Sequence, residues 1–317
     1  MSGKNVTEAL RADADGIAQA ASILAAGDLV ALPTETVYGL AARADSAEAV
    51  AKIYAAKGRP NFNPLIVHVR DIDHASEIAQ LDDRARELAE QFWPGPLTLV
   101  LPLRPDATVA KAVTAGLPTI ALRSPAHPVI RAVLEATNLG LAAPSANRSE
   151  HISPTSAAHV VQSLGTACPA VLDGGMGEHG LESSIVALRE DTKWSLLRPG
   201  PITSEQLQDL LGAPPIAANA HIEAPGQLAR HYSPAKPLRL NRSEPVSGDF
   251  MIGFGPVAGD VTLSARGDLN EAAARLYECL HLAEAAPNAG ISVAVIQSDG
   301  VGAAINDRLR RAASSVS

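Results

Sequence analysis

Two cations flank a single glycine in the stretch KGRPNFNPLIVHV, residues 57–69. Pro60 favours an extended backbone at Arg59, so this side chain projects from a loop and not along a helix. Lys57 and Arg59 placed in this way suit a polyphosphate, which arginine binds through two hydrogen bonds and lysine as a point charge. For Lys57 a second explanation is equally good, because a cation is favourable in the last turn of any helix.

Two short apolar segments each carry one titratable or charged side chain. Side chains alternate between the faces of a strand, so His68 of PLIVHV shares a face with Ile66, and Arg123 of TIALRS shares one with Thr119. A strand histidine is more often a core residue than a catalytic one. An arginine in an apolar strand needs a partner when it is buried. Arg123 therefore either pairs with an internal carboxylate or lines a cavity that receives an anion, and the strand does not decide between them.

Small polar residues and glycines cluster at several predicted turns. These stretches are PSANRS (144–149), SPTS (153–156), DGGMGEHGLESS (173–184) and LRPG (197–200). Serine hydroxyls and free backbone N–H groups at a helix start bind anions, although helix capping explains SPTS as well or better. No Walker, GxSxG or HExxH motif occurs. Such a site would act by positioning and charge stabilisation, as in phosphoryl and nucleotidyl transfer.

The overall composition excludes several classes of protein. The chain has 317 residues, 46% of them hydrophobic, and a formal net charge of −8, which argues against a general nucleic-acid-coating surface. Its two cysteines, Cys168 and Cys279, form no zinc or disulfide pattern. An acidic N-terminal stretch and the lack of a long apolar run predict a cytoplasmic protein without a membrane anchor.

Strands alternate with helices along the chain, which predicts an α/β architecture. The spacing predicts helices over 8–26, 45–58, 81–92, 127–137 and 153–165, the last with Ser153 as N-cap and Pro154 at its first position. A proline-rich stretch without apolar periodicity predicts a linker. We expect three parts, which are a first domain over 1–215, the linker over 216–237, and a small βαβ domain over 238–317 with helices at 269–285 and 302–314.

Taken together, these motifs resemble the YrdC/Sua5 family. The resemblance rests on PTETVYGL, KGRP with NPLIVHV, TIALRSP, PSAN, SPT, GLESSIV and LRPG, in this order. The stretches APGQLARHYSPAKPL and GVGAAINDRLRRAA are similar to the long, two-domain Sua5 form. The resemblance implies a YrdC-like twisted mixed sheet around a basic cavity, plus a small Rossmann-like C-terminal domain.

Members of this family are L-threonylcarbamoyl-AMP synthases, also called L-threonylcarbamoyladenylate synthases. They combine L-threonine, bicarbonate and ATP and release pyrophosphate, and a separate transferase uses the product for t6A modification of adenosine 37 in tRNA. The resemblance therefore implies a nucleotidyltransferase with Mg²⁺ carried by ATP, no organic cofactor and no metal held by protein side chains. It also implies the transferase as a partner, weak or indirect tRNA binding, and no membrane association.

The resemblance also assigns residues, position by position. The residues expected to contact L-threonine are Thr36, His68, Arg123, Ala143 and Ser183. The residues expected on the nucleotide side are Lys57, Arg59, Asn63, Thr119, Ser145, Asn147, Ser153, Arg198, His231 and Tyr232. Lys57 and Arg59 are expected to be catalytic by holding charge, without a protein nucleophile.

Two positions depart from the family pattern. Glu150 follows Ser149 where family members commonly carry glycine, and Ser184 stands where they carry threonine.

The sequence disfavours two other functions. A carbamoyl-transfer enzyme of the hydrogenase-maturation type would need zinc fingers, which two cysteines cannot build. A non-catalytic RNA-binding module is disfavoured by the net charge and by an aromatic content of only 3%, because single-strand binding uses stacking rings.

Overall fold

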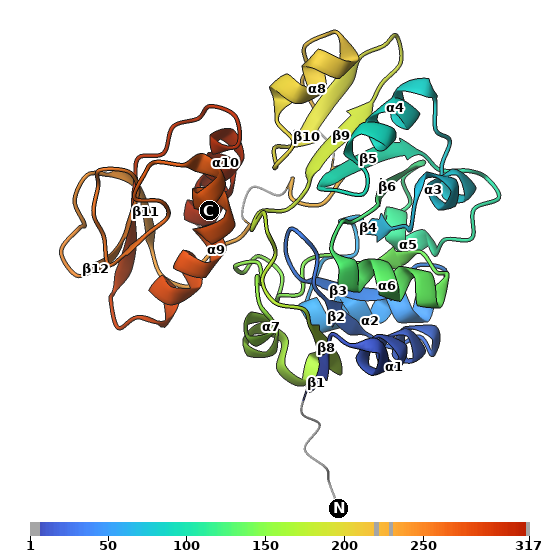
Figure 1. Ribbon diagram of the computed structural model, residues 1–317, viewed down its shortest axis with the longest axis horizontal. Coiled ribbons are helices and arrows are strands. Elements are labelled where there is room, and N and C mark those ends of the chain that lie inside the picture. Colours follow the sequence, from blue (N-terminus) through green and yellow to red (C-terminus); the bar gives the residue numbers. More distant parts are fainter. Residues whose placement is uncertain (1–6, 219–221, 228–230, 315–317) are drawn as a thin grey trace, which may run out of the picture.

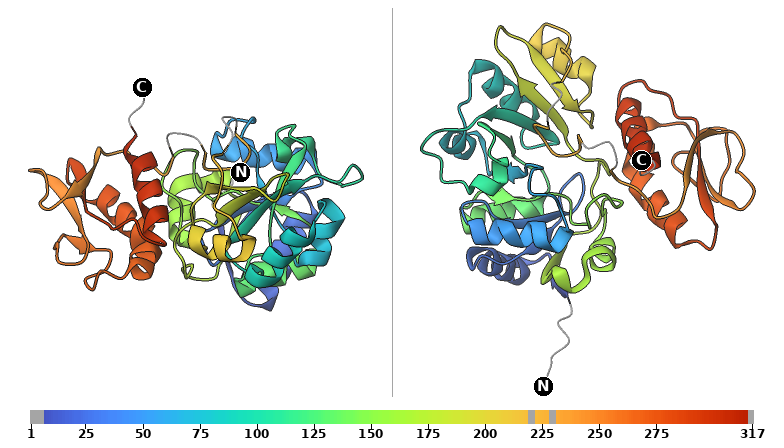
Figure 2. Two further views of the ribbon diagram at one scale, coloured as in Figure 1. Left: turned by 90° about the horizontal axis from the view of Figure 1, so that it is seen from above. Right: turned by 180° about the vertical axis from the view of Figure 1, so that it is seen from behind.

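A computed structural model describes residues 7–218, 222–227 and 231–314 of the chain. These residues form a larger and a smaller α/β part, each built on its own sheet (Figure 1). The larger sheet has ten strands and the smaller one has four. The two parts lie side by side, as the view from above in Figure 2 shows. This agrees with the predicted α/β class.

The larger sheet is mixed, as expected. Its strand order is β1-β8-β2-β3-β7-β4-β6-β5-β9-β10. It contains parallel pairs, such as β4 with β6, and antiparallel pairs, such as β5 with β6. The strands are β1 (Glu8–Arg11), β2 (Val30–Leu32), β3 (Gly39–Arg43), β4 (Ile66–His68), β5 (Leu97–Pro102), β6 (Thr119–Arg123), β7 (Leu141–Ala142), β8 (Ala170–Asp173), β9 (Ser184–Leu188) and β10 (Trp194–Arg198).

Helices cover one face of this sheet completely and the other face only in part. The helices of the larger part are α1 (Ala14–Ala25), α2 (Ala47–Lys57), α3 (Ile72–Ile78), α4 (Asp83–Phe92), α5 (Lys111–Thr114), α6 (Pro128–Thr137), α7 (Ala157–Leu164) and α8 (Ser204–Leu211). On the partly covered face, α1 and α6 pack over β1, β8, β2, β3 and β7. The remaining helices pack on the opposite face in one large core.

The uncovered end of the sheet becomes the floor of a cavity. Alternation along β4 sends Leu65, Val67 and Val69 into the large core, while Ile66 and His68 face the other way. The same alternation in β6 turns Arg123 toward the cavity. The linker segment 222–227 lies over this end, where Ala224 packs with strand residues. Period-two strands and an open sheet face therefore position the site.

Two expectations about helix starts are wrong. Residues 8–11 form a strand, because they pair in parallel with β8 at the sheet edge, and Asp13 caps α1 by accepting a hydrogen bond from the Gly16 N–H. The helix predicted from Ser153 begins at Ala157, capped by Ser156. The Ser153 hydroxyl is fully buried and donates to Glu182 at 2.6 Å, so it is not available as a cap.

The smaller part is a four-stranded, fully parallel sheet in the order β11-β14-β12-β13, which fits the predicted Rossmann-like domain. Its strands are β11 (Leu238–Arg242), β12 (Asp249–Gly253), β13 (Val261–Thr262) and β14 (Gly290–Ala294). Helix α9 (Leu269–Ala285) has the predicted bounds, and α10 (Gly302–Ala313) ends one residue early. Both helices lie on the side of this sheet that faces the larger part (Figure 1).

The two parts share one apolar cluster. Val37, Ile152 and Leu181 of the larger part pack with Tyr232 of the linker and with side chains of α9 and α10. Segments 219–221 and 228–230 of the predicted linker lie outside the described residues. Helix α8 packs on the larger core through Leu207. The interface is therefore built like a hydrophobic core, and it brings C-terminal side chains close to the cavity.

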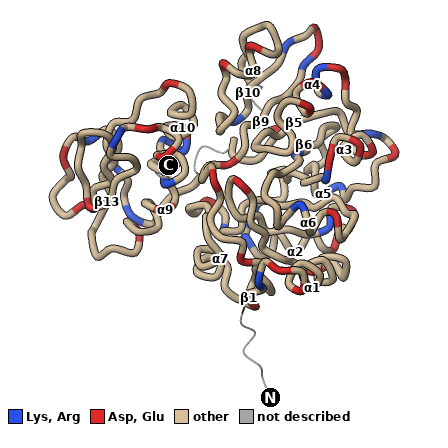
Figure 3. The backbone as a smooth tube through the Cα atoms, in the orientation of Figure 1, with Lys and Arg blue, Asp and Glu red and all other residues tan. Residues whose placement is uncertain are grey.

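Charges of both signs are interspersed along the backbone of both parts (Figure 3). Within the described residues, no helix is long and apolar enough to cross a membrane.

Candidate active site

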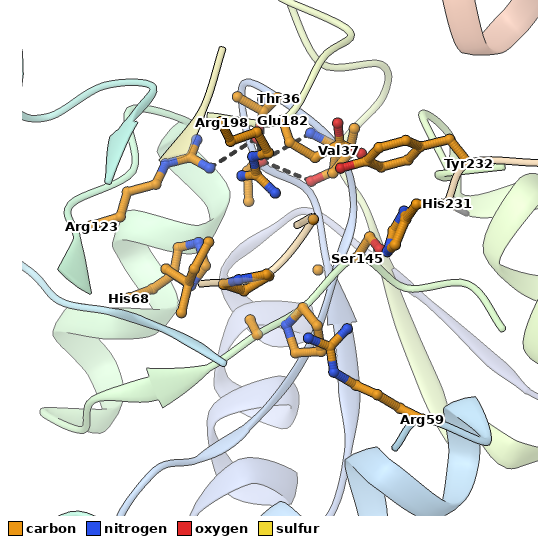
Figure 4. A pocket seen from close by; sticks show the side chains of 17 residues that line it. Thr36, Val37, Arg59, His68, Arg123, Ser145, Glu182, Arg198, His231 and Tyr232 are labelled. Atoms are coloured by element: carbon orange, nitrogen blue, oxygen red, sulfur yellow. Dashed lines mark hydrogen bonds between the residues drawn. The ribbon is translucent and has the colours of Figure 1, made fainter. Parts of the chain in front are cut away.

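The cavity lies between the open end of the larger sheet and the linker. Figure 4 shows Arg123 and His68 on one side, His231 and Tyr232 on the opposite side, and Arg59 reaching in between them. Nine of the residues predicted for the site line this cavity: Thr36, Arg59, His68, Arg123, Ala143, Ser145, Arg198, His231 and Tyr232. They come from strands, loops and the linker, and are up to 196 residues apart in sequence (232 − 36).

Arg123 both pairs with a carboxylate and lines the cavity. The sequence left these two explanations open as alternatives, and the structure shows that both are correct. Its Nη2 donates to Glu35 Oε1 at 2.5 Å, its Nη1 to Thr36 Oγ1 at 2.9 Å, and its Nε to the Gly95 carbonyl at 3.2 Å. The Arg123 and Glu35 side chains are only 4% and 5% exposed. Burial acts to raise the pKa of Glu35, but the charge and hydrogen bonds of Arg123 outweigh it and the pKa is lowered.

Arg59 and Arg198 present positive charge without a carboxylate partner in the described part of the chain. Arg59 donates to the Pro64 carbonyl at 3.0 Å, and Arg198 donates to the backbone and hydroxyl of Ser183, both at 3.0 Å. Burial lowers the pKa of Arg59 to about 10, which still leaves it protonated at neutral pH. Two buried cations held only by neutral groups favour an anionic ligand.

Lys57 has a different position from the one expected. Its ammonium donates to the Ser145 carbonyl at 2.6 Å and to the Asn147 carbonyl, and it does not line the cavity. Burial, with the charge of Arg59, lowers the pKa of Lys57 well below its usual value. Lys57 thus holds the PSAN loop against the end of α2, where Gly58 adopts the left-handed conformation that ends the helix. Its contact with phosphate and its catalytic role remain predictions.

The other predicted residues lie behind or beside the cavity wall. Asn63, Thr119, Asn147, Ser153 and Ser183 do not line the cavity, and their substrate contacts remain predictions. The Ser183 hydroxyl is shared between Thr98 and Arg198.

Several buried polar atoms in the cavity wall or behind it have no hydrogen-bond partner in the described part of the protein. They are Asn63 Oδ1, His68 Nδ1, Asn147 Oδ1, His231 Nδ1 and Tyr232 Oη. Buried polar groups are almost always paired, so a concentration of unpaired ones indicates a place for ligand or water. Burial lowers the pKa of both His68 and His231 to about 3, with a further lowering by Arg123 at His68. Both histidines are therefore neutral at pH 7.

Two carboxylates of the site were missed by the sequence reasoning. Glu35 lies in the PTET motif beside Thr36, and Glu182 lies in the GLESS motif beside Ser183. Glu182 lines the cavity, whereas Glu35 holds Arg123 from behind. Their nearness to predicted residues was a signal, but only the fold shows which arginine each carboxylate meets.

The two departures from the family pattern have local explanations. Glu150 is exposed and has φ of 68°, a left-handed conformation in which glycine costs least. Its carbonyl accepts a hydrogen bond from the Ser233 N–H at 2.7 Å, so the loop is fastened to the linker. Ser184 donates to the Ile202 carbonyl at 2.6 Å, a hydrogen bond that a threonine hydroxyl could also make.

Comparison with known proteins agrees with this architecture. A family model named for Sua5, YciO and YrdC, with the description "Telomere recombination", matches residues 22–200. The chain belongs to the Sua5/YciO/YrdC family. A second model, described as "Threonylcarbamoyl-AMP synthase, C-terminal domain", matches residues 202–314.

Relatives of the family cover nearly the whole chain. The threonylcarbamoyl-AMP synthase of Bacillus subtilis is 38% identical and spans 98% of this chain and 96% of its own. The crystal structure of Pyrococcus abyssi Sua5 complexed with L-threonine has a TM-score of 0.88 and 33% identity, and covers 97% of both chains. Full-length HypF is 20% identical with a TM-score of 0.52 over 59% of this chain, which shows a shared fold alone.

Proposed function

We propose that this protein is a threonylcarbamoyl-AMP synthase, which joins L-threonine, bicarbonate and ATP and releases pyrophosphate. One observation carries the proposal: one cavity contains Arg123, oriented by Glu35, together with Arg59 and Arg198, which have no carboxylate partner among the described residues. Two anionic substrates repel each other in water, and a cluster of fixed cations allows them to approach. The likeness to synthases over nearly the full chain length supports the same conclusion.

The reaction divides into two bond-forming steps. The amine of threonine attacks the carbon of bicarbonate, and water leaves to give a carbamate. A carbamate oxygen then attacks the α-phosphorus of ATP, and pyrophosphate leaves. Arg123 would hold the threonine carboxylate, because its guanidinium is already oriented by Glu35 and Thr36. Neutral His68 beside it would accept a hydrogen bond from, or donate one to, the substrate without adding charge.

Arg59 and Arg198 would bind the phosphates on the other side of the cavity. In the described residues, no group of three or more His, Cys, Asp and Glu side chains is arranged to hold a metal ion. Glu35 and Glu182 are each engaged by an arginine, so we expect Mg²⁺ to arrive on the triphosphate. The metal would add positive charge at the phosphates, and the protein residues supply orientation.

The linker must move for the substrates to enter. The free volume of the cavity is about 40 Å³, whereas pockets for small ligands have roughly 300–1,000 Å³. His231 and Tyr232 form the wall on the linker side. We propose that this wall opens to admit ATP and closes on it, with the unpaired His231 Nδ1 and Tyr232 Oη available to the nucleotide.

The decisive test is pyrophosphate release by the purified protein with Mg²⁺ and ATP, in the presence and absence of L-threonine and bicarbonate. Release that requires both substrates is the expected result. Release without threonine would refute the synthase. ATP-independent, salt-sensitive tRNA binding with no turnover would support the RNA-binding alternative instead.

The proposed place of the product is t6A modification of tRNA in the cytoplasm. An adenylate with a mixed anhydride hydrolyses in water, so a transferase that accepts it directly from this protein is the expected partner. Contact with tRNA is proposed to be weak or indirect, since charges of both signs are interspersed over the chain and the net charge is −8.

A further inference from the structure

Glu182 is a carboxylate in the cavity wall whose main partners come from the C-terminal domain. Arg308 Nε on α10 donates to Glu182 Oε2 at 2.8 Å, and the Tyr277 hydroxyl on α9 lies 2.9 and 3.1 Å from the two carboxylate oxygens. Ser153 of the larger part donates to Oε1 at 2.6 Å. The Arg308 side chain is fully buried and that of Glu182 is 7% exposed. This ion pair joins residues 126 apart in sequence.

Arg308 also touches the linker and its own helix. Its guanidinium lies over the ring of Tyr232 at 5.2 Å from the centroid, within cation–π range. Its Nη1 donates to Asp307 Oδ2 at 2.8 Å. One side chain of the C-terminal domain therefore contacts the catalytic wall and the linker at the same time.

The second cation that acts on Glu182 is Arg198, a proposed phosphate ligand. Both Arg308 and Arg198 lower the pKa of Glu182, against the opposing effect of burial. Arg198 itself donates only to Ser183 and has no ion pair in the described part of the chain. If Arg308 were absent, Arg198 would be the remaining guanidinium able to neutralise the buried carboxylate, and a carboxylate on Arg198 competes with phosphate.

On the basis of the proposed function, we propose that Arg308 is a positioning residue of the nucleotide site. By binding Glu182 from the C-terminal domain, it keeps Arg198 free for the phosphates of ATP. The C-terminal domain then completes the charge pattern of the active site without contacting the substrate. The further contact of Arg308 with Tyr232 connects this charge pattern to the linker that closes the cavity.

Variants of the ion pair between Glu182 and Arg308 test the proposal. We would titrate Mg·ATP by calorimetry, without threonine, into wild type, Arg308→Met and the double variant Glu182→Gln/Arg308→Met. Arg308→Met should weaken ATP binding by at least about tenfold, the effect of one lost charge-assisted hydrogen bond. The double variant should recover most of the affinity, because the neutral amide in place of the Glu182 carboxylate would carry no charge to compete for Arg198.

Two further variants separate this role from a merely structural one. Arg239→Met removes an arginine that pairs with buried Asp249 at 2.8 Å within the C-terminal sheet, and should leave ATP affinity unchanged. Arg308→Lys keeps the positive charge and should bind ATP within about threefold of wild type, which also covers the case that Arg308→Met does not fold. Unchanged affinity in Arg308→Met, or a double variant as weak as the single one, would overturn the proposal. If the wild-type protein binds ATP but releases no pyrophosphate, the synthase proposal is refuted. The ATP titrations of the variants would still decide whether Arg308 positions the nucleotide site.

Discussion

Replacing Arg123 with methionine should have two separable effects, one on folding and one on threonine binding. The ion pair of Arg123 with Glu35 is 2.5 Å long and almost fully buried. Removing one partner of a buried pair leaves an uncompensated charge and costs about 3–5 kcal/mol of folding free energy. In Arg123→Met, burial would then raise the pKa of Glu35, so the variant should lose less stability at pH 5 than at pH 8.

The effect on threonine binding follows from the hydrogen bonds with Arg123 that the carboxylate of L-threonine would lose. A hydrogen bond to a charged group contributes about 1.5–3 kcal/mol, which corresponds to a rise of about 10- to 150-fold in the KM for L-threonine. The KM for ATP should change much less, because we propose that Arg59 and Arg198, and not Arg123, bind the phosphates.

The assays are urea denaturation, followed by far-UV circular dichroism, and pyrophosphate release at varied threonine concentration. The double variant Glu35→Gln/Arg123→Met should regain most of the lost folding free energy and none of the threonine affinity. Arg104→Met is the matched control, since Arg104 pairs with Asp106 at the exposed surface and both properties should stay near wild type. A double variant no more stable than Arg123→Met would refute the assignment of the cost to an uncompensated Glu35.

Three more predictions follow from the cavity. Arg59→Met should raise the calorimetric Kd for Mg·ATP by at least about tenfold with an unchanged fold, and near-normal affinity would exclude it as a phosphate ligand. Gly226→Ala should lower turnover, because Gly226 has φ of 84° and a new Cβ would lie 2.9 Å from Tyr232 Oη, and normal kcat would show that the linker adapts. In the folded protein, the pKa of His68 and of His231 is about 3, whereas the unfolded value is about 6.5. Below about pH 6.5, the unfolded chain therefore binds more protons than the folded protein does. Each histidine should therefore remove about 2 kcal/mol of stability at pH 5, and His231→Gln should flatten the dependence of Tm on pH.

Local patterns were sufficient to predict which strand residues share a face, but not that this face lines the cavity. Alternation along β4 and β6 placed His68 and Arg123 on the same faces that the structure shows, because a strand has a side-chain period of two whatever surrounds it. Helix α9 has the bounds expected from its periodicity, with Asp268 accepting from two backbone N–H groups at its start. The order of motifs similarly indicated the family, and through it most residues that line the cavity.

Partnerships between distant residues were decided by the tertiary structure alone. Sequence patterns could not show that Arg123 meets Glu35, 88 residues away, or that Arg308 reaches Glu182 across the interface. The same holds for residues 8–11, which have helical neighbours but form a strand because β8 offers an unpaired edge. Local propensity depends on a few adjacent residues, whereas the free energy of a buried charge depends on which opposite charge the folded chain brings within hydrogen-bonding distance.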